Sequence, residues 1–207
     1  TLFRSRELGE VLADYAGLGE TLSQRRQAAA VKLEEGISRL IQELGMPQGQ
    51  LQVEVRSDPD REPAPWGRDE VEFLFSANQG MPPRSLGRVA SGGELSRIGL
   101  AIQVAATHGK SVPTLIFDEV DSGIGGGIAE VVGRKLRLLG EDRQVFCVTH
   151  LPQVAAQGHQ HLLVRKTRQG DVAQSSVSAI EDDARVAEIA RMLGGSVITQ
   201  QTLAHAE

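Results

Sequence analysis

The sequence predicts an α/β fold with parallel core strands, preceded by one long amphipathic helix. Apolar residues recur every three or four positions through residues 2–45, which is the spacing of one helix face. Between residues 114 and 149 a strand pattern, a helix pattern and a second strand pattern follow one another. Apolar residues make up 40% of the 207 residues, so length and composition allow one compact domain with an appendage.

The first predicted element is a helix that ends at Gly45, Met46 and Pro47. Its apolar face consists of Leu8, Val11, Tyr15, Leu18 and Leu22, followed by Ala29, Leu33, Ile37, Leu40 and Leu44. Two interpretations fit this face equally well: an amphipathic helix lying on a globular body, or a coiled-coil arm that enters a domain. We expect the chain to divide into residues 1–46 and 47–207.

Two antiparallel strands are expected next. Residues 51–55 and 71–75 alternate apolar with polar side chains, and the acidic, proline-rich stretch 58–69 between them indicates an exposed loop. A loop rich in proline and glycine follows over residues 80–87.

The α/β part is expected between residues 92 and 193. Its predicted elements are a helix over 92–108, a strand over 114–117, a helix over 127–139, a strand over 145–149, a hairpin of strands 162–165 and 172–180, and a helix over 184–193. The order strand, helix, strand implies a parallel pair. Because residues 114–117 are all apolar or β-branched, we expect this strand to be buried on both faces.

The charge balance excludes an overall positive field around the chain. There are 22 Lys and Arg residues against 27 Asp and Glu residues, which gives a formal net charge of -5. Any contact with nucleic acid must therefore be local. With only 5 Phe, 1 Trp and 1 Tyr, the sequence also excludes a wide aromatic platform for stacking many bases.

Cysteine use and hydropathy point to a cytoplasmic protein without a membrane partner. The single cysteine, Cys147, cannot form an internal disulfide, and the sequence has no signal-peptide pattern and no apolar run of transmembrane length. Since Cys147 lies in the strand predicted over residues 145–149, we expect it to be a small core residue.

Two adjacent carboxylates, Asp118 and Glu119, end the strand predicted over residues 114–117. Parallel sheets bind their ligands at the carboxyl ends of their strands. A turn at this point lets Asp118 approach a hydrated Mg²⁺ while Glu119 faces an attacking water, which is the arrangement of a Walker B strand with a catalytic acid beside it. The alternative is that both carboxylates merely cap the following helix.

A capping box begins the helix predicted over residues 92–108. Ser91 is the expected N-cap, and Glu94 lies three residues further on. Capping does not require Gly92 and Gly93, each of which weakens the helix by roughly 1 kcal/mol relative to alanine. Their benefit must lie outside the helix, and we expect them to expose backbone N–H groups to an approaching phosphate.

Together these motifs resemble those of ABC ATPases. The segments 91–95, 114–119, 120–123 and 149–150 have the order and spacing of the signature motif, Walker B, D-loop and H-loop. A closer resemblance is to the RecN family, SMC-like bacterial ATPases of double-strand-break repair. It is carried by the amino-acid sequences of residues 89–98, 117–126, 149–155 and 188–195. The N-terminal helix resembles the returning arm of that family's coiled-coil hairpin, which favours the arm interpretation.

The resemblance implies the C-terminal lobe of an ABC-type P-loop ATPase head, with ATP and Mg²⁺ bound between two heads. In the head that holds the nucleotide, Asp118 would bind Mg²⁺ through water. Glu119 would orient or deprotonate the attacking water, and His150 would contact the γ-phosphate and help to align that water.

The resemblance also implies partners. The signature residues Ser91, Gly92, Gly93 and Glu94 would close over ATP held by a second copy of the head, with Ser91, Gly92 and Gly93 on its γ-phosphate. Asp121 would lie at the seam of this homodimer. An N-terminal lobe of the same protein would carry Walker A, and DNA enters as a partner through the resemblance alone.

The sequence departs from the family pattern in one respect, because Gly-x-x-x-x-Gly-Lys-Ser/Thr occurs nowhere in it. Gly109-Lys110-Ser111 has Val104 where the first glycine belongs and closes a predicted helix. The glycines within residues 123–127 fit no phosphate loop and are expected to give a turn its backbone freedom. We therefore expect a segment of a longer protein that binds ATP weakly by itself and does not hydrolyse it.

Three further groups of residues are weak candidates for metal or phosphate binding. They are His159 and His161; Arg134, Lys135 and Arg137; and Arg165, Lys166 and Arg168. We expect a solvated loop rather than a metal site for the histidines. For the first basic group we expect a favourable interaction with the helix dipole, and for the second, which follows a predicted strand, a solvated hairpin rather than phosphate contacts.

The function expected from these motifs is ATP hydrolysis coupled to head dimerisation and to DNA tethering at double-strand breaks. One alternative is a structural clamp that ATP closes and that turns over too slowly to matter. A second alternative is the nucleotide-binding subunit of a membrane transporter. The predicted coiled-coil arm and the amino-acid sequence of residues 91–98 disfavour it.

Overall fold

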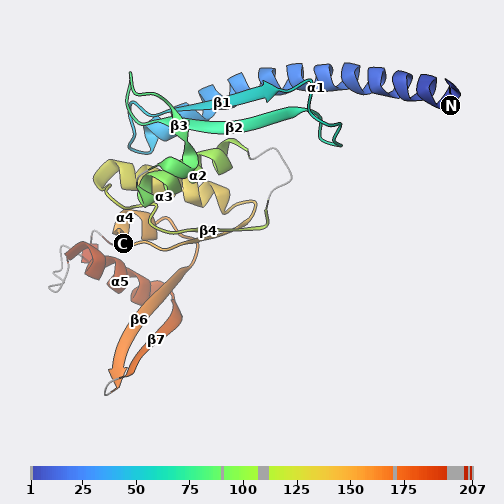
Figure 1. Ribbon diagram of the computed structural model, residues 1–207. Helices are drawn as coiled ribbons and strands as arrows, with labels where there is room; N and C mark the ends of the chain where they lie inside the picture. Colours follow the sequence, from blue (N-terminus) through green and yellow to red (C-terminus); the bar gives the residue numbers. More distant parts are fainter. Residues whose placement is uncertain are drawn as a thin grey trace. The chain divides into compact units, whose positions relative to one another are not determined.

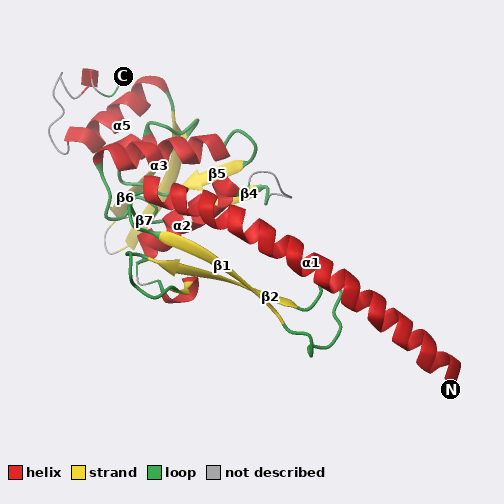
Figure 2. Cartoon of the chain, turned by 90° about the horizontal axis from the view of Figure 1, so that it is seen from above, coloured by secondary structure: helices red, strands yellow, loops and turns green. Residues whose placement is uncertain are grey.

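The chain forms two compact units in the computed structural model (Figure 1, Figure 2). The described residues are 2–89, 91–106, 112–169, 172–194, 203, 204 and 206. The arm unit consists of Thr1–Gln42 and Met46–Ala90, and the lobe unit of Glu43–Gly45 and Ser91–Glu207. The division at residue 46 stays a prediction. None of the described helices is long and apolar enough to cross a membrane.

The arm unit combines a long helix with a three-stranded antiparallel sheet. Helix α1 spans Leu2–Glu43, strands β1, β2 and β3 span Gln50–Ser57, Asp69–Ser76 and Arg84–Ser85, and a short 3₁₀ helix, η1, spans Leu86–Arg88. The strand order is β1-β2-β3, and the two long strands run beside α1 (Figure 2). The two predicted strands are confirmed, whereas β3 and η1 lie where only a loop was expected.

Side chains of α1 attach β1 to the helix. The Ser38 hydroxyl accepts a hydrogen bond from the Leu51 N–H at 2.9 Å, and Glu34 Oε1 accepts one from the Val53 N–H at 2.7 Å. These bonds satisfy donors that the sheet leaves free at this edge. The core beneath them consists of Ala30, Ile37, Ile41, Leu51, Val53 and Phe75.

The apolar face of α1 is uncovered towards its N-terminus. Leu8, Val11 and Leu18 are 58%, 59% and 72% exposed. A helix that presents an uncovered apolar stripe in water needs a partner helix along it. The stripe therefore favours the coiled-coil arm over a helix that lies on a globular body.

The lobe unit is built on a two-stranded parallel sheet. Strands β4 and β5 span Thr114–Phe117 and Gln144–Cys147, and the helices are α2 at Gly92–Ala105, α3 at Gly126–Leu139 and α4 at Pro152–Ala155. The chain continues into a hairpin of β6, His161–Gln169, and β7, Val172–Ile180, and then into α5, Asp182–Gly194. The predicted parallel pair is thus confirmed. Core residues include Leu44, Ile98, Leu100, Ala101, Val120, Ala129, Val132 and Leu139.

The prediction that the strand at 114–117 is buried on both faces is wrong. Phe117 is only 7% exposed, but Ile116 is 73% exposed and Phe146, opposite it in the register, is 40% exposed. Alternate residues of a strand face opposite sides of the sheet, and burial of both sides needs a layer on each. The described part of the lobe unit provides that layer on one side only. Cys147 is half-buried, not fully buried as expected.

Several boundaries differ from those predicted. Strand β6 continues to Gln169, so the basic residues Arg165, Lys166 and Arg168 lie inside a strand and do not follow one. Helix α4 was not predicted because four residues are too short for a periodic pattern. Residues 107 and 108 of the helix predicted over 92–108 lie outside the described residues, as do Gly109, Lys110 and Ser111.

Candidate functional site

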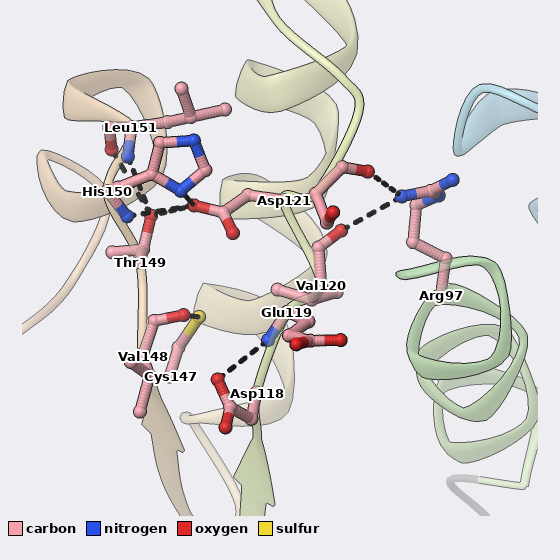
Figure 3. Close-up of polar contacts among 11 residues, drawn as sticks. Arg97, Asp118, Glu119, Val120, Asp121, Cys147, Val148, Thr149, His150 and Leu151 are labelled. Atoms are coloured by element: carbon pink, nitrogen blue, oxygen red, sulfur yellow. Dashed lines mark hydrogen bonds and ion pairs between the residues drawn. The ribbon is translucent and has the colours of Figure 1, made fainter. Parts of the chain in front are cut away.

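Asp118 and Glu119 lie at the carboxyl end of β4, where the chain leaves the sheet. Glu119 has a φ of 58°, in the left-handed region that side chains rarely adopt. Its N–H donates to Asp118 Oδ1 at 2.9 Å (Figure 3). Both side chains are exposed. The chain turns at this point, as the sequence predicts, and both carboxylates face solvent rather than the core.

Helix α2 begins next to these carboxylates. Ser91 is the N-cap, and its side chain accepts from the Glu94 N–H at 3.4 Å, which confirms the predicted start of the helix. One turn later, the Ser96 hydroxyl donates to the Asp118 carbonyl oxygen at 2.7 Å. This bond fixes the start of α2 relative to the end of β4.

Gly93 is needed for packing within the lobe unit, whereas the close neighbour of Gly92 is the end of the flexible Glu119 side chain. A Cβ at residue 92 would overlap Glu119 Oε2, and one at residue 93 would lie 2.9 Å from Ser122 Cβ and 3.0 Å from the Ser122 carbonyl oxygen. The benefit of Gly93 therefore lies outside the helix, as predicted, and the role of Gly92 stays a prediction. Close approach to the 119–122 turn contributes to the benefit of Gly93, in addition to the expected access for phosphate.

Arg97 connects α2 to the 120–122 turn by hydrogen bonds. Its Nη1 donates to the Ser122 carbonyl oxygen at 2.8 Å and to that of Val120 at 3.4 Å, and the residue is 5% exposed (Figure 3). Burial lowers the pKa of the guanidinium, against the smaller opposing effect of Glu94. Sequence reasoning missed this role. The sequence signal for this role was the helix face that Arg97 shares with Gly93 and Leu100. Arg97 follows Gly93 by four residues and precedes Leu100 by three.

Asp121 holds the segment that follows β5. Its Oδ2 accepts from the Thr149 hydroxyl at 2.5 Å and from the His150 N–H at 3.0 Å, and lies 3.2 Å from His150 Nδ1 (Figure 3). The Asp121 side chain is 3% exposed, whereas that of His150 is 72% exposed. Asp121 thus orients an exposed histidine that, like Asp118 and Glu119, follows the carboxyl end of a strand of the parallel sheet. Thr149 is a second positioning residue that sequence reasoning missed.

The carboxylates at this edge suit a magnesium ion held largely by water. Mg²⁺ prefers oxygen ligands and commonly keeps several waters beside one or two carboxylates. Asp118 offers an exposed carboxylate whose orientation is fixed by the Glu119 N–H. Among the described residues no group of three or more His, Cys, Asp and Glu side chains is placed to hold a metal by itself. The exposed Asp118 carboxylate is a suitable ligand for a hydrated Mg²⁺, and the water-mediated contact itself stays a prediction.

Cys147 ends β5, opposite Phe117, the residue that precedes these carboxylates. Its thiol donates to the Val148 carbonyl oxygen with 3.8 Å between sulfur and oxygen (Figure 3). Burial, and then the charges of Asp121 and Asp118, raise the pKa of the thiol from 9.0 to about 12. The neutral thiol therefore predominates at all physiological pH values.

We expect alkylation of Cys147 by iodoacetamide at pH 8 to be at least about 100-fold slower in the native chain than in urea, because only the thiolate reacts. As the folded pKa is raised, the neutral thiol favours the folded state below pH 9, and this contribution is lost as the pH rises towards 12. The alkylation rate followed by mass spectrometry measures the effect. Equal rates in the two conditions would contradict it.

The weaker candidates have structural roles. Arg134 pairs with Glu130, Lys135 pairs with Glu43, and Arg137 donates to the Gln157 carbonyl oxygen. His161 begins β6 and is half-buried, so the expectation that it lies in a solvated loop is wrong. Burial, followed by the charge of Arg185 and opposed by Glu188, lowers the pKa of His161. Within the 123–127 turn, Gly123 and Gly126 have positive φ, which confirms their predicted backbone role.

No protein-family model matches the chain. Curated relatives match nearly all of it. The chain is 49% identical over 199 residues to the DNA repair protein RecN of Xylella fastidiosa, covering 96% of the chain and 35% of the relative. It is 44% identical over 201 residues to RecN of Vibrio cholerae, covering 97% and 36%. It is 40% identical over 205 residues to RecN of Streptomyces coelicolor, covering 94% and 36%. The chain thus spans about a third of the length of these relatives.

Solved structures with a similar fold are SMC head domains. A head with a coiled coil and joint from Pyrococcus yayanosii has a TM-score of 0.57 at 20% identity, over 80% of this chain and 29% of that one. A structure from a study of ATP-driven dimerization and DNA-stimulated activation of SMC ATPases has a TM-score of 0.51 at 16% identity, over 84% and 99%. Sequence identity and fold agree: the chain belongs to the RecN family and has the α/β fold of SMC head domains, with a coiled-coil helix at its start.

Proposed function

We propose that this chain is one lobe of a composite ATPase head that acts in DNA repair, with ATP hydrolysis coupled to head dimerisation and DNA tethering. The observation that carries the proposal is the arrangement of Asp118 and Glu119 beside the N-terminus of α2, with His150 held by Asp121 at the same edge of the parallel sheet. The RecN relatives favour DNA repair over the transporter alternative.

Within one head, the exposed groups divide the work on ATP. Glu119 orients the attacking water or accepts its proton, and His150 contacts the γ-phosphate through its exposed ring. Asp118 would hold Mg²⁺ through water, and the ion would supply charge neutralisation on the phosphates. Asp121 is buried, so we assign it to orienting His150 as well as to the neighbourhood of the dimer seam.

The second head contributes through its signature segment. Ser91, Gly92, Gly93 and Glu94 form the first turn of α2, whose free N–H groups and positive dipole end suit the γ-phosphate of ATP held by the opposing head. Phosphoryl transfer depends mainly on positioning and charge stabilisation, so residues from two subunits suffice.

The proposed N-terminal lobe would cover the open side of the parallel sheet. Ile116, Phe146 and Val148 expose 73%, 40% and 61% of their surface on or beside β4 and β5. Parallel strands are ordinarily covered on both faces. A lobe that packs here would also supply Walker A, which this sequence does not contain. We place the assembled protein in the cytoplasm, at the nucleoid.

Reconstitution with the N-terminal lobe tests the proposal. We expect this chain alone to bind ATP weakly and to show no turnover, and the mixture of the two lobes to hydrolyse ATP faster in the presence of DNA. The measurement is phosphate release with and without DNA, at equal protein concentrations. A folded, reconstituted head that neither binds nor cleaves ATP would overturn the enzyme assignment.

A further inference from the structure

The β6–β7 hairpin extends away from the helices of the lobe unit (Figure 1). Every side chain over residues 164–168 and 173–179 is exposed. A two-stranded hairpin with neither face covered is marginally stable in water. These residues form the outer part of the hairpin and do not pack against the core of the lobe unit. Binding to a ligand would therefore stabilise them.

The hairpin is positively charged, whereas the chain as a whole is negatively charged. Strand β6 carries Arg165, Lys166 and Arg168, whereas the described residues of the two strands include no Asp or Glu. The chain as a whole has a net charge of -5. The three cations lie within about 10 Å along the strand, comparable to the screening length of about 8 Å at physiological salt, so they repel one another until an anion binds.

Strand register places two of these cations on one face. Lys166 lies opposite Ser175 and Arg168 opposite Ala173, both small, and the two cations are about 7 Å apart along β6. Arg165 points to the other face. There its charge is the smallest of the effects that lower the pKa of Glu188, after the Arg191 hydrogen bond and the charges of Arg191 and His161, while burial opposes them. Lys166 and Arg168 make no ion pair within the described part of the chain.

We propose that Lys166, Arg168 and Ser175 bind backbone phosphates of duplex DNA, with the β6–β7 ribbon lying in or along a groove. The DNA class rests on the proposed function. Arg, Lys and Ser side chains are typical phosphate donors, and the major groove, about 12 Å wide, admits a two-stranded ribbon. Because the contacts are to phosphates, binding is independent of base sequence. The exposed apolar residues Leu162, Val164 and Val177 share this face but lie nearer the root of the hairpin, so the phosphate contacts are confined to its outer half.

Fluorescence anisotropy of a labelled 30-base-pair duplex, with the complete 207-residue chain titrated at several salt concentrations, tests the proposal. We expect the double variant Lys166→Gln/Arg168→Gln to bind roughly 30- to 100-fold more weakly at about 0.1 M salt. The slope of log K against log salt should fall by about 1.8, for two lost phosphate contacts. The variant Lys166→Arg/Arg168→Lys should retain wild-type affinity and slope, because it keeps both charges.

A charge-matched control uses Lys32→Gln/Arg39→Gln, two exposed residues of α1. Equal losses in this control and in the hairpin variant would overturn the assignment, since net charge alone would then explain the effect. Wild-type binding by the hairpin variant would also overturn it, and would direct the search for a hairpin partner to proteins. If the wild-type chain does not bind the duplex, the hairpin assignment is overturned. The proposed function is tested separately, by ATP turnover of the reconstituted head without DNA.

Discussion

Replacement of Glu119 by glutamine in the reconstituted head is expected to lower ATP turnover by roughly 100- to 10,000-fold while ATP-dependent dimers persist. Glutamine has the shape of glutamate and tolerates the same backbone, so the left-handed φ of 58° at this position stays as it is. The substitution removes only the charge and the basicity of a carboxylate that lies against Gly92 at the start of α2. Phosphate release measures turnover, and size-exclusion chromatography with ATP measures the dimers.

The matched control is Glu141→Gln, which removes the same charge from an exposed residue after α3. We expect it to leave turnover and dimerisation unchanged. If Glu119→Gln reduces turnover no more than this control does, Glu119 is not the catalytic base. The slow structural clamp would then be favoured, because a clamp requires ATP-dependent dimers but hardly any hydrolysis.

Local patterns predicted much of the lobe unit. The strand at 114–117 and the N-cap at Ser91 were both placed correctly, because side-chain alternation and capping depend on neighbours a few residues apart. The parallel pairing of β4 with β5 followed from element order alone. These features were sufficient to bring Asp118 and Glu119 to one edge of the sheet.

Contacts between residues far apart in the chain were not predictable from the sequence. Asp121 is 28 residues from Thr149, and Arg97 is 25 residues from Ser122, so no short-range pattern indicates either hydrogen bond. The exposure of Ile116 had the same origin, because burial of a strand depends on layers that its own four residues do not specify. The packing role of Gly93 likewise became visible only with the 119–122 turn in place.

Alanine at residue 93 is expected to destabilise the lobe unit despite a higher helix propensity. The added methyl would lie 2.9 Å from Ser122 Cβ, 3.0 Å from the Ser122 carbonyl oxygen and 3.1 Å from that of Glu119. The last two are backbone atoms of a turn that Arg97 holds by hydrogen bonds, so they cannot rotate away. Overpacking of this kind costs roughly 1–3 kcal/mol, while alanine gains about 1 kcal/mol over glycine in a helix.

Gly99 of the same helix separates these two effects. A Cβ there meets no atom within 4 Å, so Gly99→Ala should stabilise the chain by about 1 kcal/mol through helix propensity alone. The difference in unfolding free energy between the two variants, measured by urea denaturation with far-UV circular dichroism, is therefore the overpacking cost of roughly 1–3 kcal/mol. Equal stabilities would mean that the turn moves freely away from α2. In that case Gly93 would serve phosphate access alone.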